Sequence, residues 1–184
     1  MLKSKIRNFK TLFSTNQKAK ELALGLSPSW TVIVAEKQTG GYGRKGAAWF
    51  SPGGGLYFSI ILPKSQIEDL QTLTILAAFI TAKTIKENFN LEPFIKLPND
   101  VWINGKKIAG ILTENIVRPT SGGHPDVKLS IMGIGLNTNI DKFPKELENI
   151  ATSLKIELGR EVDNKKILSQ IIEGLKEQLK TISQ

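Results

Sequence analysis

The chain has 184 residues, 40% of them hydrophobic and 23% charged, which is the composition of a globular domain large enough to bury a core. The absence of cysteine excludes disulfides and thiolate chemistry, and a single histidine, His124, excludes a metal site built from a histidine cluster. The formal net charge of +8 predicts an anionic partner, for which nucleic acid, a nucleotide and an acidic protein all qualify.

No targeting or membrane segment is expected. Residues 1–9 lack the apolar core of a signal peptide, and the sequence contains no run of about twenty apolar residues. No repeat or low-complexity tract divides the chain, so residues 1–184 are predicted to form one domain. We therefore expect a cytoplasmic protein that does not enter a membrane.

The first predicted elements are a helix and two strands. Ser14-Thr15-Asn16 precedes residues 17–24, which end at Gly25, and this is the punctuation expected at the two ends of a helix. Residues 31–34 and 56–62 are rich in β-branched and aromatic side chains and are predicted to be strands.

Between these strands lies a glycine-rich segment. Seven of the sixteen glycines fall between Gly40 and Gly55, with Arg44 and Lys45 among them. Because glycine costs about 0.5–1 kcal/mol relative to alanine in a helix or strand, we predict neither element here. Glycine lets backbone N–H groups turn toward an anion, so composition leaves a ligand-binding loop and a plain surface loop equally open.

A long helix follows the second strand. Residues 65–68, Ser-Gln-Ile-Glu, have the spacing of a capping box, and a helix is predicted from Leu70 to about Asn88. Its core stripe consists of Leu73, Leu76, Ala77, Ile80, Thr84 and Ile85.

The middle of the chain reads as strands. Residues 94–97 form a short strand ended by a proline, and residues 101–103 and 107–116 are joined by Asn104-Gly105, which favours a tight hairpin turn. A further strand covers residues 127–136, after a polar loop that begins near Arg118.

Two helices are predicted near the C-terminus. Pro144 opens a short one, and Asp163 caps a longer one. The apolar stripe of the longer helix consists of Ile167, Leu168, Ile171, Ile172, Leu175, Leu179 and Ile182. This mixture of helices and strands predicts an α+β fold with a mixed or antiparallel sheet.

Three regions resemble the motifs of biotin protein ligases, in the family's order. Residues 38–52, QTGGYGRKGAAWFSP, resemble the adenylate-binding loop G-R-G-R-x-G-R-x-W-x-S-P. Residues 96–100, KLPND, and 106–114, KKIAGILTE, resemble K-W-P-N-D and K-x-A-G-I-L-x-E. Residues 133–137, GIGLN, resemble G-I-G-x-N, so the resemblance covers most of the chain from about Ser14 onward.

The resemblance implies both a fold and a reaction. The fold is that of the biotin and lipoate ligases, related to class II aminoacyl-tRNA synthetases. The reaction joins biotin to Mg-ATP as biotinyl-5′-AMP and then transfers biotin to a lysine of a biotin carboxyl carrier protein. Biotin, ATP and Mg²⁺ are thus the expected ligands, DNA is not expected, and a homodimer is compatible with the family.

The resemblance also assigns site residues. Those implied for biotin are Ser14, Thr15, Asn16, Gln38, Gly41, Tyr42, Gly43, Arg44, Lys96, Gly110 and Leu112. Those implied for ATP and the adenylate are Arg44, Lys45, Trp49, Lys96, Asn99, Lys107 and Asn137. Asp100 is the implied Mg²⁺ ligand, because hard cations prefer oxygen. Without the resemblance, Asn99 and Asp100 read as a turn and Asn137 as a strand-end cap.

Two of these residues are implied to be catalytic. Lys96 would lie between the biotin carboxylate and the α-phosphate and cancel their repulsion. Arg44 would hold the adenylate phosphate through a charge-assisted hydrogen bond worth about 1.5–3 kcal/mol. Such chemistry depends on positioning and charge neutralisation rather than on a nucleophilic side chain, which suits a chain without cysteine.

The chain departs from the family pattern at several places. Tyr42 stands where the motif has its first arginine, Ala47 where a second basic residue often lies, and Leu97 where tryptophan is common. The resemblance also implies a minimal catalytic core, without the helix-turn-helix and the C-terminal β-barrel of other members. Three alternatives stay open: a lipoate-type ligase, a weakened biotin binder that needs a partner, and a basic module that binds nucleic acid.

Overall fold

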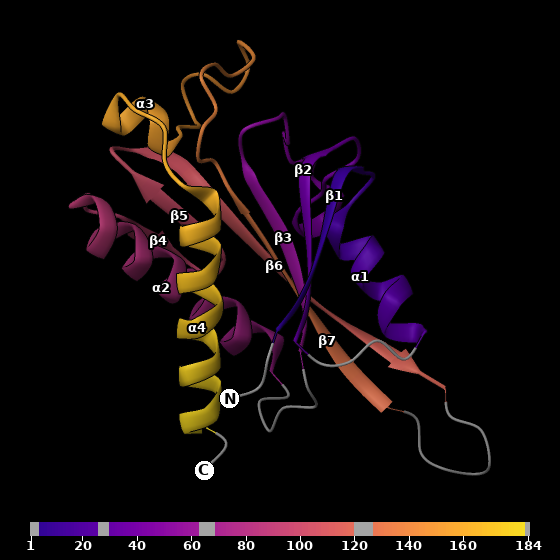
Figure 1. The fold of residues 1–184 in the computed structure, drawn as a ribbon. Coiled ribbons are helices and arrows are strands. Elements are labelled where there is room, and N and C mark those ends of the chain that lie inside the picture. The colour runs from indigo at the N-terminus through magenta and orange to yellow at the C-terminus, as the bar shows by residue number, and fades with distance from the viewer. Residues whose placement is uncertain (1–3, 26–29, 63–68, 120–126, 183–184) are drawn as a thin grey trace.

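The computed structural model describes residues 4–25, 30–62, 69–119 and 127–182. Its centre is a seven-stranded sheet in the order β1-β2-β3-β7-β6-β5-β4 (Figure 1). The strands are β1 (Lys5–Leu12), β2 (Thr31–Gln38), β3 (Leu56–Leu62), β4 (Phe94–Lys96), β5 (Asp100–Ile103), β6 (Lys106–Arg118) and β7 (Val127–Leu136). β1 pairs with β2 in parallel, and the other neighbouring pairs are antiparallel, so the predicted mixed sheet is confirmed.

Helices cover both faces of the sheet. They are α1 (Thr15–Leu24), α2 (Leu70–Phe89), α3 (Leu154–Leu158) and α4 (Asn164–Ile182), with a 3-10 turn at Arg44–Gly46. Helices α2 and α4 lie on one face and α1 on the other (Figure 1). None of the described helices is long and apolar enough to cross a membrane.

The helix ends follow the predicted capping in part. The Ser14 hydroxyl accepts the Gln17 N–H at the start of α1, and Asp163 accepts backbone N–H groups at the start of α4, as predicted. The N-cap of α2 is Asp69, whose carboxylate accepts two backbone N–H groups. The predicted capping box at residues 65–68 lies outside the described residues.

Two other predictions near the chain ends need comment. The helix predicted to open at Pro144 is wrong, because residues 145–150 form turns and the short helix starts at Leu154. The turns do not continue as a helix since Ala151 leaves them to form a bridge with Lys107. Strand β1 was not predicted at all, because it is an edge strand whose mostly exposed residues lack a clear apolar pattern.

The prediction that the glycine-rich segment contains no helix or strand is wrong in one detail. Arg44–Gly46 form a 3-10 turn, and an isolated bridge joins Tyr42 to Ala48. Lys45 has a φ of 56° and Gly46 a φ of 75°, so the tip reverses through the left-handed region that glycine favours. The Asn104-Gly105 hairpin turn is confirmed, since both residues have positive φ and join β5 to β6.

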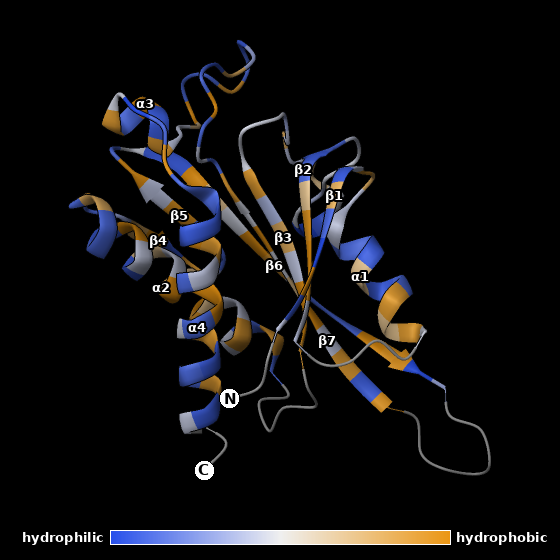
Figure 2. Ribbon diagram, in the orientation of Figure 1, coloured by the Kyte–Doolittle hydropathy of each residue, from blue (hydrophilic) through white to orange (hydrophobic). Residues whose placement is uncertain are grey.

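The core is divided between the two faces. On one face the apolar stripes of α2 and α4 share one core cluster with strand residues, as predicted, except that Leu76 is half-buried and the side chain of Ile182 lies outside the described part of the chain. The outer side of α4 is polar (Figure 2). On the other face α1 buries Ala19 and Ala23 against Ile33, Ile61 and Ile131. Because α1 is only 10 residues long, it covers part of its face and leaves the rest for a cavity.

Candidate active site

A cavity of about 390 Å³ opens on the face of the sheet that α1 covers only in part. The start of α1, the glycine-rich segment and strands β6 and β7 enclose it. It gathers most of the predicted site residues, namely Ser14, Thr15, Asn16, Gln38, Tyr42, Gly43, Arg44, Lys45, Trp49, Asn99, Asp100, Lys107, Gly110 and Leu112.

Three glycines make room for this cavity in the middle of the sheet. Gly110 lies directly opposite Gly135 on β7, and Gly133 lies opposite Leu112 on β6. A Cβ atom at Gly133 would collide with the side-chain oxygen of Asn16, and one at Gly135 with the ring of Trp49. The missing side chains let loop and helix residues approach the strands closely, which explains the two glycines in β7.

One end of the cavity holds a chain of polar side chains. The Gln38 side-chain oxygen accepts the Thr15 N–H at 2.8 Å, and its amide donates to Ser51 Oγ at 2.9 Å. On the sheet, the Ser59 hydroxyl lies 2.8 Å from Thr15 Oγ1 and 2.6 Å from Asn16 Oδ1. This end of the cavity thus presents donors and acceptors that are already oriented by one another.

A carboxylate on β6 joins three elements beside this polar end. Glu114 accepts hydrogen bonds from Asn16 Nδ2 at 2.8 Å and from the Tyr42 hydroxyl at 3.1 Å. Its other oxygen forms an ion pair with Lys20 Nζ at 2.6 Å. Glu114 therefore ties α1 and the glycine-rich segment to the sheet.

The charges in this cluster alter two pKa values. Burial raises the pKa of the Tyr42 phenol, and the adjacent Glu114 carboxylate raises it further. Burial lowers the pKa of Lys20, but its hydrogen bond and charge interaction with Glu114 outweigh this and leave the pKa raised. Tyr42 thus stays a neutral donor and Lys20 a cation across the physiological range.

The opposite end of the cavity is basic. The Arg44 guanidinium donates to Asn99 Oδ1 at 3.2 Å, and both Arg44 and Lys45 are exposed. Lys107 Nζ forms an ion pair with Asp100 at 2.7 Å and lies 5.1 Å from the centre of the Trp49 ring. Arg44, Lys45 and Lys107 line the cavity, and Asp100 is the one acidic residue among the described lining residues. The basic charge therefore exceeds the acidic charge, and this end favours an anion.

A second cavity, of about 190 Å³, adjoins the first and shares Ala48, Trp49 and Lys107 with it. Its other lining residues are Phe50, Asn137, Phe143, Leu147, Ile150 and Ala151, so its walls are mainly apolar. Two buried polar atoms, Trp49 Nε1 and Asn137 Oδ1, have no hydrogen-bond partner among the described residues. A buried acceptor of this kind normally finds a partner, so Asn137 Oδ1 is available to a donor group of a ligand or to a water molecule.

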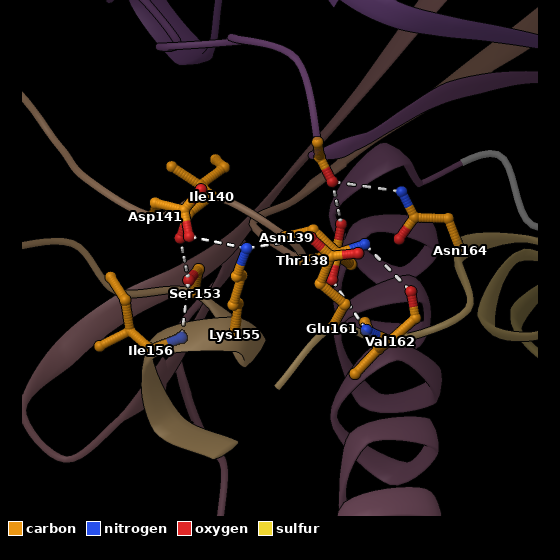
Figure 3. A network of polar contacts seen from close by, with 11 residues as sticks. Thr138, Asn139, Ile140, Asp141, Ser153, Lys155, Ile156, Glu161, Val162 and Asn164 are labelled. Carbon is orange, nitrogen blue, oxygen red and sulfur yellow. Dashed lines mark hydrogen bonds and ion pairs between the residues drawn. The ribbon is translucent and has the colours of Figure 1, made fainter. Parts of the chain in front are cut away.

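The position of Asn137 is set by the chain around it. Its Nδ2 donates to the Thr152 carbonyl at 2.9 Å, which leaves Oδ1 as the orphan. The residues that follow are held by the network in Figure 3, in which Asn139 exchanges two hydrogen bonds with the backbone of Val162. Lys155 also bridges Asp141 and Glu161, and these carboxylates raise its pKa.

Three predicted site residues are not on the lining of the main cavity. Gly41 packs behind the polar end, against Gln38 and Ser51, and Asn137 belongs to the second cavity. Lys96 lies at the sheet edge with its Nζ 4.3 Å from the centre of the Trp102 ring. Lys96 pairs directly with Asp100 across β4 and β5, so it shares the face of the sheet that carries the main cavity.

Some residues of the site had no predicted role. Glu114 and Ser51 fall inside quoted motifs, Ser59 lies opposite Gly133 on the neighbouring strand, and Lys20 lies one turn after Asn16 on α1. The helical spacing of Lys20 and the motif position of Glu114 were visible in the sequence. The register that places Ser59 behind Thr15 and Asn16 was not visible in the sequence.

Comparison with known proteins agrees with this geometry. The model of the biotin/lipoate A/B protein ligase family matches residues 9–137. The chain is 40% identical over 165 residues to the bifunctional ligase/repressor BirA of Bacillus subtilis, covering 88% of the chain and 49% of that protein. It is 34% identical to a biotin--[acetyl-CoA-carboxylase] ligase of Paracoccus denitrificans, covering 84% of the chain and 65% of that protein.

A solved structure is similar along nearly the whole chain. Biotin protein ligase from Aquifex aeolicus, in complex with biotin and ATP, matches with a TM-score of 0.84 at 32% identity, covering 97% of this chain and 72% of that one. The chain spans about half to two thirds of the length of the curated relatives described above. The predicted fold and the resemblance to biotin protein ligases are both confirmed, and the chain belongs to the biotin/lipoate A/B protein ligase family.

Proposed function

We propose that this chain is a biotin protein ligase. It would activate biotin with Mg-ATP to biotinyl-5′-AMP, release pyrophosphate, and transfer biotin to a lysine of a biotin carboxyl carrier protein in the cytoplasm. The observation that carries the proposal is one cavity with a pre-oriented polar end, a basic end and an adjoining apolar compartment. These three parts correspond to the ureido ring, the phosphate and the adenine of a biotinyl-adenylate.

The polar end suits a neutral ring that both donates and accepts hydrogen bonds. Gln38, Thr15 and Asn16 line the cavity and are each held by a neighbour, so a bound ureido group would meet groups that need no reorganisation. Gly133 and Gly135 let Asn16 and Trp49 lie directly on the strands, so a bound ring system would meet these two side chains rather than the bare sheet.

The second cavity suits adenine. Its apolar walls would cover the ring faces, and the orphan Asn137 Oδ1 would accept a hydrogen bond from the exocyclic amino group. Trp49 lines both cavities, so an adenylate would pass over it from the phosphate to the base. This supports the predicted roles of Trp49, Lys107 and Asn137 in nucleotide binding.

The chemistry would depend on charge. Arg44, at the junction between Asn99 and the main cavity, would neutralise the α-phosphate and later hold the adenylate. Lys96 shares a face with the cavity through its pair with Asp100, and its flexible side chain would turn from Trp102 toward the reacting carboxylate and phosphate. No side chain forms a covalent bond in this scheme.

Mg²⁺ would come with ATP. Mg²⁺ keeps several waters and binds one or two carboxylates besides substrate phosphates, and Asp100 at the basic end fits this requirement. The described residues contain no cluster of three or more His, Cys, Asp or Glu that could hold a metal without phosphates. When bound, Mg²⁺ would neutralise charge on the phosphates, while Lys107 keeps Asp100 oriented through their ion pair.

The experiment that tests the proposal is pyrophosphate release from Mg-ATP with biotin or with lipoate as the acid. We expect pyrophosphate release with biotin and none with lipoate. Release with lipoate alone would assign the chain to the lipoate branch of the same family. Binding of biotin without any release would support the weakened binder considered from the sequence.

A further inference from the structure

Lys20 lies behind the polar end of the main cavity and lines neither of the cavities described above. Its ammonium nevertheless contacts a lining residue, because Nζ donates to the Tyr42 hydroxyl oxygen at 3.4 Å. The same Nζ lies 2.6 Å from one oxygen of Glu114, whose other oxygen accepts a hydrogen bond from the Tyr42 hydroxyl. Helix α1, strand β6 and the glycine-rich segment therefore meet in a closed ring of polar contacts.

This ion pair is more shielded from water than its neighbour on α1. The Lys20 and Glu114 side chains are 29% and 24% exposed, whereas those of the pair Lys18 and Glu21 are 34% and 53% exposed. Removal of one partner of a shielded pair leaves the other charge uncompensated, which costs more than the loss of an exposed pair. The Lys20 ammonium thus balances a negative charge that would otherwise lie alone beside the cavity.

A carboxylate only accepts hydrogen bonds, so Glu114 sets the direction of the bonds around it. Asn16 Nδ2 donates to it at 2.8 Å, which turns Asn16 Oδ1 toward the Ser59 hydroxyl, 2.6 Å away. The Tyr42 hydroxyl likewise donates its single proton to Glu114, at 3.1 Å. Asn16 and Tyr42, which both line the cavity, are therefore held in one orientation by a carboxylate behind them.

Position 42 carries a neutral side chain where the biotin protein ligase motif has an arginine. An arginine would bring both hydrogen-bond donors and a positive charge on a single side chain. Here the two are separated, since Tyr42 provides a donor from the glycine-rich segment and Lys20 provides the charge from α1. Lys20 follows Asn16 by four residues on α1, so both side chains reach Glu114 from the same side of the helix.

We propose that Lys20 is a positioning residue for biotin binding, which holds Glu114 and, through it, the cavity residues Asn16 and Tyr42. It supplies from α1 the positive charge that the glycine-rich segment lacks at position 42. The inference rests on the proposed function, in which Asn16 and Tyr42 bind biotin. Because Lys20 does not line the cavity, its effect on the ligand would be indirect.

A purely structural tie between α1 and β6 is the competing role of this ion pair. Such a tie would change the stability of the fold, but it would leave the affinity of the folded chain for biotin unaltered. Both Lys20 and Glu114, however, contact Tyr42, a cavity residue that belongs to neither element. Asn16 places a second cavity residue on the same carboxylate, and these contacts favour the positioning role.

The first test removes the charge. Lys20→Met keeps a long side chain without the ammonium, and Lys18→Met is the matched control, since Lys18 lies on the same helix and pairs with the more exposed Glu21. Calorimetry measures biotin affinity for the variants that circular dichroism shows to be folded. We expect Lys20→Met to weaken biotin binding about tenfold and Lys18→Met to change it by less than about twofold.

The second test returns the charge from the other side of Glu114. In the double variant Lys20→Met/Tyr42→Arg, an arginine would face the carboxylate alone, and biotin binding should recover to within about threefold of the natural chain. In the natural background, Tyr42→Arg should instead weaken binding, because two cations would then compete for one carboxylate. A purely structural tie predicts no such reversal.

The Tyr42 phenol reports the same charges. Burial raises the pKa of this phenol, Glu114 raises it further, and the nearby Lys20 ammonium lowers it. Lys20→Met should therefore raise the pKa of Tyr42, opposite in direction to the effect of removing the Glu114 charge. Ultraviolet absorbance follows this titration, and Lys18→Met should leave it unchanged.

The outcomes decide between the two roles. Biotin binding by Lys20→Met as tight as that by Lys18→Met would overturn the positioning role, as would a double variant that binds no better than Lys20→Met or an unchanged Tyr42 titration in Lys20→Met. If Lys20→Met does not fold, Tyr42→Arg decides, since unchanged or tighter biotin binding in that variant would overturn the inference. Absence of biotin binding by the natural chain would contradict the proposed function instead.

Discussion

At the scale of single residues, Glu114 connects the cavity to its surroundings. One carboxylate accepts hydrogen bonds from Asn16 and Lys20 of α1 and from Tyr42 of the glycine-rich segment. Hydrogen bonds to a charged group contribute about 1.5–3 kcal/mol each to stability, more than those between neutral groups. Tyr42, which departs from the family motif, is therefore part of a cluster that the chain completes with Lys20.

Replacing this carboxylate gives the first prediction. Glu114→Gln should weaken biotin binding about tenfold, or ~1.4 kcal/mol, because Asn16 and Tyr42 then donate to a neutral amide oxygen instead of a carboxylate and the ion pair with Lys20 is lost. The variant should also lower the pKa of the Tyr42 phenol, since a neighbouring negative charge that disfavours the phenolate is removed. Calorimetry measures the affinity, and ultraviolet absorbance follows the phenol titration.

The titration is readable because the chain contains two tyrosines. Tyr57 is fully buried, and burial raises its pKa far above that of an exposed phenol, so it titrates last. Tyr42→Phe is the control that removes the earlier transition. An unchanged Tyr42 transition in Glu114→Gln would show that the carboxylate does not control this phenol.

The second prediction concerns Arg44. Arg44→Gly should still form the adenylate but release it roughly ten- to over a hundredfold faster, because a charged hydrogen bond of about 1.5–3 kcal/mol is lost. Released biotinyl-adenylate would acylate exposed lysines of any protein nearby. The measurement is biotin transfer to an unrelated lysine-rich protein, and labelling no higher than that by the natural chain, with pyrophosphate still made, would refute the assignment.

The third prediction concerns Lys96, which lies over Trp102 rather than in the cavity. Lys96→Ala should slow adenylate formation about a hundredfold or more while biotin binding changes far less, because the charge acts mainly in the transition state. Trp102→Leu is the control, as it removes the ring contact and leaves the ammonium. A near-normal rate in Lys96→Ala would exclude the catalytic role.

At the scale of elements, the glycine-rich segment is held at its ends and open at its tip. The backbone N–H of Trp49 donates to the Gly41 carbonyl at 2.9 Å, and the Tyr42 hydroxyl donates to Glu114. Residues 44–48, between these anchors, are exposed. The side chain of Arg44 contacts Asn99 from this exposed tip. Motion of this tip would therefore admit ligands without loss of the polar end.

The fourth prediction follows from this arrangement. Trypsin cleavage after Arg44 or Lys45 should be suppressed by biotin together with ATP, because the tip would then order over the adenylate. Cleavage should be faster in Glu114→Gln, in which the hydrogen bond that anchors the segment at Tyr42 is weakened by loss of the charge. Equal cleavage with and without both ligands would contradict the prediction.

Elements with strong local signals were predictable from the sequence. Helix α1 has a serine cap and a glycine stop, α4 has a long amphipathic stripe, and the Asn104-Gly105 turn has the residues that a tight hairpin needs. The edge strand β1 and the turns after Pro144 depend on partners distant in the sequence, and they were missed or wrong. Local propensity does not contain such long-range pairings.

At the scale of the whole molecule, the two faces of the sheet have different roles. One face is a continuous apolar core under α2 and α4, and the other is shared between a smaller core under α1 and the cavity. Motif resemblance found most lining residues, since each motif contributes to this second face. The adjoining cavity around Asn137 depends on contacts between segments far apart in the sequence, which the sequence did not reveal.

The central claim is that one chain holds biotin and the nucleotide as a single adenylate across these cavities. Native mass spectrometry of the 184-residue chain, after incubation with biotin and Mg-ATP and removal of free ligand, tests it directly. We expect the protein mass to rise by one biotinyl-5′-AMP, and we expect no such adduct when biotin is omitted. A chain that retains biotin or ATP alone, and never their joined product, would contradict the account.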